Sequence, residues 1–282
     1  MRKASALSRF VASGIAVGVL LSGCGQAQEP PAASEVRAPA AGKYPARDVD
    51  PATLPAGSLY RNPASGRDEV VVPDMGNTAL LIGDSQSEPS DGWPRLGLAA
   101  VGYKVHFCGR GGTGFVTANG KTGNYVDALH RGDWKLPYGT PPLIVIQGGG
   151  NDAAHGATDA QIVANADRLI AALRERYPGS RMAMIGTLAR GTNYGGGRRS
   201  QVDALLGTVA AKHGMPFVGV GDWLTKYRLA QNLDDAVHMN AAGRRSLGAL
   251  LEGRLRQLRL EAQPGGMPGS LKASATDALW TD

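Results

Sequence analysis

Short apolar runs alternate with longer amphipathic stretches between about residues 76 and 260. Runs of four or five consecutive apolar residues are typical of strands that a parallel sheet buries on both faces. Stretches in which apolar residues recur every three or four positions are typical of helices with one buried face. The apolar runs predict strands at residues 79–82, 103–107, 143–147, 181–185 and 217–220.

Helical patterns occupy the connections between these runs. Thr158-Asp159-Ala160-Gln161 resembles a capping box, in which the first and last side chains each accept a hydrogen bond from the other residue's backbone N–H. The apolar stripe that follows consists of Ile162, Ala166, Leu169, Ile170 and Leu173. Similar patterns predict helices within residues 92–102 and 202–214 and after Asn240. Strands that alternate with helices predict an α/β fold, a doubly wound parallel sheet with right-handed crossovers.

The amino-terminal pattern predicts a targeting segment rather than part of the fold. Positive charge at residues 1–3 precedes an apolar run at 10–21 that is too short to span a bilayer, and small residues follow. This order is typical of a signal peptide, here residues 1–23. Its end, Leu21-Ser22-Gly23-Cys24, resembles the lipobox of bacterial lipoproteins, in which the cysteine is lipidated and becomes the first mature residue. We expect an exported protein, lipid-anchored at Cys24 to the cell membrane or cell surface. The alternative is an ordinary signal peptide with an incidental cysteine.

Both flanks of the alternating region lack periodicity. Residues 24–75 are rich in Ala, Pro, Ser and Glu, a composition typical of a disordered tether. Residues 261–282 are polar and rich in Gly and Pro, which indicates a flexible tail. The folded domain is therefore expected at residues 76–260.

Composition and charge narrow the range of partners. The formal net charge is +6, but the arginines are scattered and no basic run is interleaved with aromatics, so nucleic-acid binding is not expected. If Cys24 carries a lipid, Cys108 is unpaired, and a small buried side chain at a strand end is a better interpretation of it than a catalytic thiol. No cofactor is expected, because the glycines of residues 109–114 lack the G-x-G-x-x-G order of a dinucleotide site. We also expect no metal ion and a monomeric chain.

Polar residues directly follow three of the predicted strands. Ser85 lies past the first, Gly111-Gly112 past the second and Asn151 past the third. The carboxyl ends of parallel strands meet at one edge of the sheet, where open α/β folds bind their ligands. A serine hydroxyl there can act as a nucleophile if a base reaches it and N–H groups face the oxyanion that forms.

A histidine base is predicted from its spacing to an aspartate. An Asp three residues before a His can orient the imidazole from the same turn. This spacing occurs at Asp127 with His130, Asp152 with His155, and Asp235 with His238. His238 is the best candidate, because it lies between the last strand and the last helix, where a loop can fold over the sheet edge. His130 lies in the long connection after the second strand, and His155 shares a loop with the end of the third. His106 and His213 lack such a carboxylate and are interpreted as structural.

Four short blocks follow one another in the order found in a known family. They are Gly83-Asp84-Ser85-Gln86-Ser87, a glycine of Gly111-Gly112-Thr113-Gly114, Gly149-Gly150-Asn151-Asp152, and Asp235-Ala236-Val237-His238. Each block is weak alone, but four in order at predicted strand ends are specific, and residues 76–260 resemble the SGNH or GDSL-like hydrolases. The resemblance implies a flavodoxin-like three-layer αβα sandwich with a five-stranded parallel sheet. Gln86 departs from the pattern, since many relatives have an apolar residue there.

The resemblance implies a serine ester hydrolase that cleaves short-chain acyl esters through an acyl-enzyme. It implies that Ser85 is the nucleophile, that His238 is the general base, and that Asp235 holds the imidazole. The implied oxyanion hole consists of the Ser85 N–H, the Gly112 N–H and the Asn151 side chain. Gly111 is an alternative to Gly112. Two other functions stay open: an acyltransferase that uses the same triad on envelope glycans, and a binding lipoprotein without catalysis.

The substrate expected from the resemblance is an acyl ester of an envelope glycan or lipid. Long loops at the carboxyl ends of strands usually shape pockets, and residues 115–142 form a long connection. This connection carries Tyr125, His130, Trp134 and Tyr138, and a later loop carries Tyr194. Such side chains either stack on sugar rings or pack within the loops, and the sequence does not decide between these roles.

Overall fold

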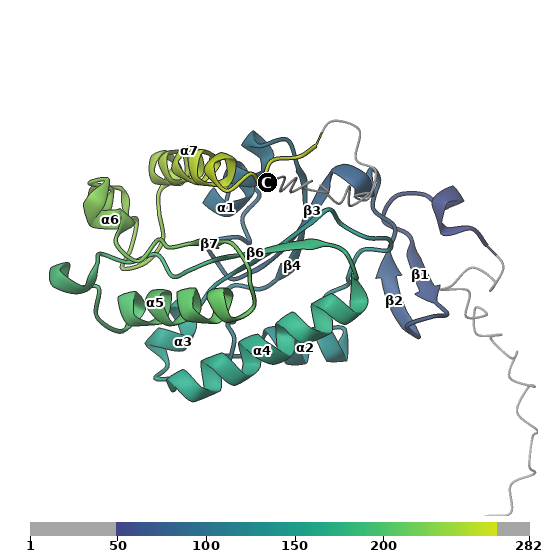
Figure 1. The fold of residues 1–282 in the computed structure, drawn as a ribbon, viewed down its shortest axis with the longest axis horizontal. Coiled ribbons are helices and arrows are strands. Elements are labelled where there is room, and N and C mark those ends of the chain that lie inside the picture. Colours follow the sequence, from purple (N-terminus) through teal and green to yellow (C-terminus); the bar gives the residue numbers. More distant parts are fainter. Residues whose placement is uncertain (1–48, 264–282) are drawn as a thin grey trace, which may run out of the picture. The chain divides into compact units, whose positions relative to one another are not determined.

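A parallel sheet lies between two layers of helices in residues 49–263, the part of the chain that the computed structural model describes (Figure 1). The strands of this sheet are β3 (Thr78–Gly83), β4 (Lys104–Gly109), β5 (Leu143–Gln147), β6 (Arg181–Ile185) and β7 (Phe217–Val218). Their order is β4-β3-β5-β6-β7, and every neighbouring pair is parallel. The chain thus starts inside the sheet, turns outward once and then continues in the other direction, which is the flavodoxin-like order. The α/β fold predicted from the sequence is confirmed.

Helices follow the strands and cover both faces of the sheet. One layer holds α1 (Trp93–Ala100) and α7 (Ala241–Gln257), and the other holds α2 (Tyr125–Arg131), α4 (Asp159–Arg176) and α5 (Gly197–Lys212) (Figure 1). The connections also contain two short helices, α3 (Gly150–Ala154) and α6 (Trp223–Lys226), and one-turn 3-10 segments at Pro51–Thr53, Met75–Asn77, Thr192–Tyr194 and Ala230–Asn232. The capping box predicted at Thr158 and Gln161 is present and begins α4.

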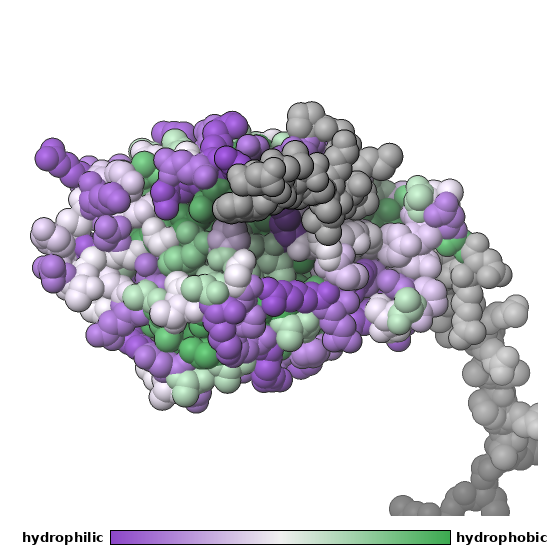
Figure 2. All heavy atoms as spheres, viewed as in Figure 1, coloured by the Kyte–Doolittle hydropathy of each residue, from purple (hydrophilic) through white to green (hydrophobic). Residues whose placement is uncertain are grey.

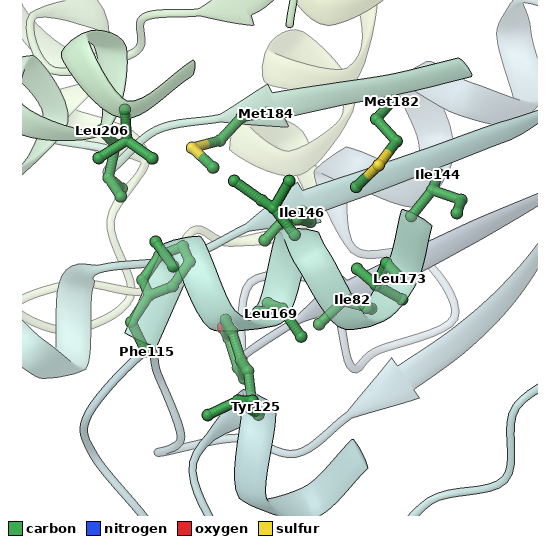
Figure 3. Close-up of a cluster of buried hydrophobic side chains, with 14 of the residues drawn as sticks. Ile82, Phe115, Tyr125, Ile144, Ile146, Leu169, Leu173, Met182, Met184 and Leu206 are labelled. Carbon is green, nitrogen blue, oxygen red and sulfur yellow. The ribbon is translucent and has the colours of Figure 1, made fainter. Parts of the chain in front are cut away.

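Alternate side chains of each strand serve two separate cores. Leu80 and Ile82 of β3 belong to the core under α2, α4 and α5, whereas Leu81 belongs to the core under α1 and α7. Figure 3 shows the first core, in which Ile82 and Ile146 lie beside Leu169 of α4. All of these side chains are fully buried. Burial on both faces explains why the strands appear in the sequence as continuous apolar runs.

Two glycines let α1 and α7 pack closely. A Cβ added to Gly97 of α1 would lie 2.6 Å from Leu251 Cδ2 of α7, and a Cβ added to Gly248 of α7 would lie 2.8 Å from Leu96 Cβ. Real Cβ atoms do not come this close to a neighbour, so glycine is needed at both positions. Because α1 follows the end of β3 and α7 follows the last loop, this contact also brings together the segments that precede the two helices.

A hairpin at residues 59–70 corrects the prediction of a disordered tether that extends to residue 75. β1 (Leu59–Asn62) and β2 (Arg67–Val70) form an antiparallel pair. The sequence conceals this pair because the fully buried position of β2 is a charged residue, Glu69. Its carboxylate accepts two hydrogen bonds from Arg176 of α4, at 2.6 and 2.5 Å. Burying a carboxylate is tolerated where it is paired in this way.

One further prediction needs correction. The fifth strand ends at Val218 rather than at residue 220, because the Val220 N–H donates to Asp203 Oδ1 at 3.1 Å instead of pairing in the sheet.

The second half of the 115–142 connection runs to the amino-terminal edge of the sheet, where the Tyr138 N–H donates to Val70 O at 2.8 Å. Tyr125 is buried in the core, and its hydroxyl donates to Gln147 O at 2.9 Å. The Tyr138 ring packs edge to face against Tyr60, with ring centroids 5.0 Å apart, so Tyr125 and Tyr138 both pack within the protein.

The predicted signal peptide, Cys24 and most of the predicted tether and tail lie outside the described residues. No helix within residues 49–263 is long and apolar enough to cross a membrane. Figure 2 shows polar side chains over both helical layers and apolar side chains mainly in the band between them. Cys108 on β4 is fully buried, as interpreted from the sequence, and burial raises the pKa of its thiol far above the ordinary value.

Candidate active site

The turn after β3 places Ser85 at the carboxyl edge of the sheet. The buried Asp84 accepts the Gln86 N–H at Oδ1 (3.0 Å), and its carbonyl accepts the Ser87 N–H at 2.9 Å. A Cβ at Gly83 would lie 2.7 Å from Ser87 Oγ, so glycine is needed for a turn this tight. Burial raises the pKa of the Asp84 carboxyl to about 6, although the hydrogen bond from Gln86 opposes the rise.

His238 connects this serine to a carboxylate. Its Nε2 lies 2.9 Å from Ser85 Oγ, and its Nδ1 lies 2.7 Å from Asp235 Oδ2. Asp235 Oδ1 accepts the N–H groups of Val237 and His238, at 2.8 and 2.7 Å. The hydrogen bond with the His238 ring, aided by these N–H groups, lowers the pKa of Asp235 well below its usual range. An ionised carboxylate can only accept, so Nδ1 carries a proton, and in the neutral ring Nε2 accepts from the Ser85 hydroxyl.

The three residues implied as nucleophile, base and orienting carboxylate thus form one hydrogen-bonded chain, and the other histidines lie elsewhere. Their nearest polar partners are Arg67 for His130 Nδ1 (3.3 Å), Asn151 O for His155 Nδ1 (2.8 Å), Lys135 O for His106 Nε2 (3.1 Å) and Asp167 for His213 Nε2 (2.6 Å). Of the five histidines, all of which lie within residues 49–263, only His238 has a hydrogen bond with Ser85.

The loop after β4 passes beside Ser85 at Gly111. The Gly111 N–H donates to Glu88 Oε2 at 2.8 Å, and a Cβ at Gly111 would lie 3.3 Å from Ser85 Cβ. Neither the Ser85 N–H nor the Gly112 N–H forms a hydrogen bond within the described part of the chain. Of the two glycines left open by the sequence, Gly111 thus has its N–H bonded to a side chain, whereas the Gly112 N–H has no such bond within residues 49–263.

Asn151 approaches the same loop from the first turn of α3. Its Nδ2 donates to Thr113 O at 2.9 Å, which uses one of the two amide hydrogens. The next residue, Asp152, is fully buried and accepts the N–H groups of Phe115, Val116 and Thr117, at 2.8 to 2.9 Å. Helix α3 therefore holds the glycine-rich loop in place with two consecutive side chains.

The family follows from a sequence comparison that covers this site. A family model described as the GDSL-like Lipase/Acylhydrolase family matches residues 81–245, more than half of the chain. The chain belongs to this family. The resemblance stated from the sequence is thus confirmed. Members of this family are esterase-type hydrolases. Lipid attachment at Cys24 stays a prediction.

Solved structures share the fold of this GDSL-like hydrolase at low sequence identity. A carbohydrate esterase family 2 enzyme from Corynascus thermopiles has a TM-score of 0.52 and 16% identity, over 69% of this chain and 70% of that chain. An active-site mutant of a family two carbohydrate esterase from Clostridium thermocellum has a TM-score of 0.51 and 15% identity, over 67% of each chain. The lipase/acylhydrolase from Enterococcus faecalis has a TM-score of 0.50 and 19% identity, over 66% of this chain and 98% of that chain. No curated protein sequence matches the chain.

Three side chains near the site of this GDSL-like hydrolase were missed by the sequence analysis. Glu88 binds the Gly111 N–H, and Arg199 donates to Leu188 O and Gly150 O, at 3.1 and 3.3 Å. The Gln147 amide faces Ser87 Oγ at 2.7 Å. Gln147 had a usable signal, because it is a polar residue at the end of an otherwise apolar strand. Glu88 and Arg199 had none, since charged residues in a turn or in the first turn of a helix are common on protein surfaces. No group of three or more His, Cys, Asp or Glu side chains in residues 49–263 is arranged to hold a metal ion.

Proposed function

We propose that the protein is a serine esterase that hydrolyses short-chain acyl esters through a covalent acyl-enzyme. The observation that carries this proposal is the hydrogen-bonded chain from Ser85 Oγ to His238 and Asp235, with distances of 2.9 and 2.7 Å. This arrangement fits the nucleophile, general base and orienting carboxylate of a serine hydrolase. The Ser85 and Gly112 N–H groups and the Asn151 amide are the proposed oxyanion donors.

The proposed reaction proceeds in two stages. Ser85 Oγ bonds to the ester carbonyl carbon while its proton moves to His238 Nε2, and the carbonyl electrons form an oxyanion. The oxyanion collapses, the bond to the alcohol oxygen breaks, and the alcohol leaves with the proton from Nε2. Water then attacks the acyl-serine and gives a proton to Nε2. Ser85 recovers that proton as the acid is released.

The openness of the site supports a small acyl group on a bulky alcohol. The side chains of Asp235 and His238 are 55% and 43% exposed, so the site is not enclosed by protein on this side. A long acyl chain needs an apolar cavity that removes it from water, whereas a short one needs little burial. With the predicted anchor at Cys24, the proposed substrate is an acyl ester of an envelope glycan or lipid. The same open site also admits an acceptor hydroxyl in place of water, which keeps acyl transfer as the second candidate.

Hydrolysis of p-nitrophenyl acetate tests the proposal. Ser85→Ala should abolish hydrolysis and labelling by a fluorophosphonate while circular dichroism stays unchanged. His130→Ala is the matched control, because this histidine also follows an aspartate by three residues but contacts Arg67 instead of Ser85. Substantial hydrolysis by Ser85→Ala would refute the assignment. Product analysis with and without a glycan acceptor separates hydrolysis from acyl transfer.

A further inference from the structure

Gln86 joins the turn that carries Ser85 to the turn that carries His238. Its side chain is buried, 8% exposed, and its Nε2 donates to the Val237 carbonyl at 2.9 Å across 151 positions of the chain. Within residues 49–263, only two hydrogen bonds connect residues 84–88 with residues 233–240: this one and the Ser85–His238 hydrogen bond itself.

Trp93 fixes which way the Gln86 amide points. Its indole Nε1–H donates to Gln86 Oε1 at 3.0 Å, and the ring is fully buried at the start of α1. An indole can only donate, so the amide oxygen must face Trp93 and the amide nitrogen must face Val237. The orientation of the link is therefore set by the protein rather than by solvent.

Hydrogen bonds within the Asp235–His238 turn hold its backbone and the imidazole of His238 together. Asp235 Oδ1 accepts the N–H groups of both Val237 and His238, and Oδ2 contacts the His238 ring. Because Val237 is held within that turn, a hydrogen bond to its carbonyl limits the movement of the whole turn. A second bridge runs through Arg244, which pairs with Asp91 at 2.8 Å and donates to Met239 O at 2.7 Å. Its contact with Asp91 is expected to restrain the turn less, because the Asp91 side chain is 53% exposed.

We propose that Gln86 is a positioning residue, which holds the His238 turn at hydrogen-bonding distance from Ser85. The expected effect on catalysis rests on the proposed function, whereas the effect of Gln86 on the position of the imidazole does not depend on it. Without the amide, the half-exposed turn keeps its internal Asp235–His238 contact but loses its fixed distance from the nucleophile. A misplacement of about 1 Å at a reacting group costs up to about 100-fold in rate.

Two substitutions and one control test this in the full chain with p-nitrophenyl acetate. Gln86→Met keeps the length of the side chain and removes both hydrogen bonds, and kcat should fall about 10- to 100-fold with KM within about twofold. The acid limb of the pH profile should stay in place, because the Asp235–His238 contact is intact. Trp93→Phe should cause a smaller loss of kcat. Without the indole N–H, the Gln86 amide can rotate so that its oxygen instead of its nitrogen faces the Val237 carbonyl part of the time.

Tyr177→Phe is the matched control. It also removes a buried hydrogen bond from a side chain to a backbone carbonyl, that of Tyr177 with Pro137 at 2.7 Å, but at the other edge of the sheet. It should lower the melting temperature and leave kcat unchanged. A kcat for Gln86→Met as high as that of Tyr177→Phe would overturn the proposal.

Nitrogen-15 NMR of labelled histidines tests whether Gln86 positions His238 without any measurement of ester hydrolysis. In Gln86→Met, the Nε2 resonance of His238 should move toward its position in Ser85→Ala, where the hydroxyl partner is missing. The Nδ1 resonance should stay, because Asp235 still binds it. If the wild type hydrolyses no ester, the proposed function fails, and the Nε2 shift alone tests Gln86. An Nε2 resonance unchanged from the wild type would overturn the inference.

Discussion

His238 Nε2 lies 2.9 Å from Ser85 Oγ, although 153 positions separate the two residues. Ser85 precedes α1 and His238 precedes α7, and these helices pack against each other on the same face of the sheet. The close approach of Gly97 to Leu251 therefore helps to bring the two turns together. The site depends on helix packing as much as on the common direction of the strands.

Asp235→Asn should abolish most of the activity while the protein stays folded. The carboxamide presents an N–H to His238 Nδ1, so the ring proton moves to Nε2, which then cannot accept the proton of Ser85. In a buried triad this substitution costs about 10⁴-fold in kcat. Since the Asp235 side chain is 55% exposed, water can replace part of its role, and we expect a loss of about 100- to 10⁴-fold. Steady-state kinetics on p-nitrophenyl acetate measures it.

Asp234→Asn is the control for this prediction. Asp234 is exposed, and the one hydrogen bond it forms within the described residues is between its backbone N–H and His238 O, at 2.8 Å. Its activity should match that of the wild type. Equal losses in the two variants would mean that general charge, rather than the contact with the imidazole, supports activity.

Asn151→Ala should lower kcat about 100- to 1000-fold with a small change in KM, the usual cost of one oxyanion donor. Its amide also donates to Thr113 O, so part of any loss could come from the loop. Asn165→Ala separates the two effects, because Asn165 Nδ2 holds the same loop through Phe115 O at 2.8 Å from the far side. Similar losses in both variants would contradict a direct role for Asn151.

The stability of the protein should depend on pH through Asp84. Burial raises its folded-state pKa to about 6, above the ordinary 3.8, so the folded state binds a proton more tightly than the unfolded state. The stabilisation is therefore fully present below about pH 4 and is lost as the pH rises to about 6. Relative to Asp84→Asn, the wild type should lose up to about 3 kcal/mol of unfolding free energy between pH 4 and pH 7. Urea unfolding of both proteins measures this difference, and a constant difference would contradict it.

The fold was predictable because burial on both faces leaves a clear pattern. Leu143–Gln147 is a strand in both the prediction and the structure, and the capping box at Thr158 marks the start of α4. The hairpin at residues 59–70 was not predictable in this way. Its buried position is Glu69, and a charged residue that is paired with a distant arginine reads as surface in a hydrophobicity pattern.

The site was predictable as far as it depends on residue types at strand ends. The hydrogen-bonded chain of Ser85, His238 and Asp235 was expected from the strand ends, the Asp–His spacing and the order of the motifs, whereas the role of Asn151 stays a prediction. The hydrogen bonds of Gln86 with Val237 and of Glu88 with Gly111 join segments far apart in sequence and leave no periodic signal. Such contacts depend on how α1 and α7 pack, which the sequence pattern does not specify.

Gly97→Ala should reduce stability and activity together. The added Cβ would lie 2.6 Å from Leu251 Cδ2 and 2.8 Å from Leu251 Cβ, so α1 and α7 must separate or repack. Overpacking of a core typically costs about 1 to 3 kcal/mol. Because the two turns of the site precede these helices, kcat should fall as well. Adding Leu251→Gly removes the Cδ2 and the Cβ that the new methyl group would meet, so the double variant should recover kcat relative to Gly97→Ala even though a glycine inside α7 lowers its stability. Full kcat in Gly97→Ala, measured below its melting temperature, would show that the helix contact does not set the distance between Ser85 and His238.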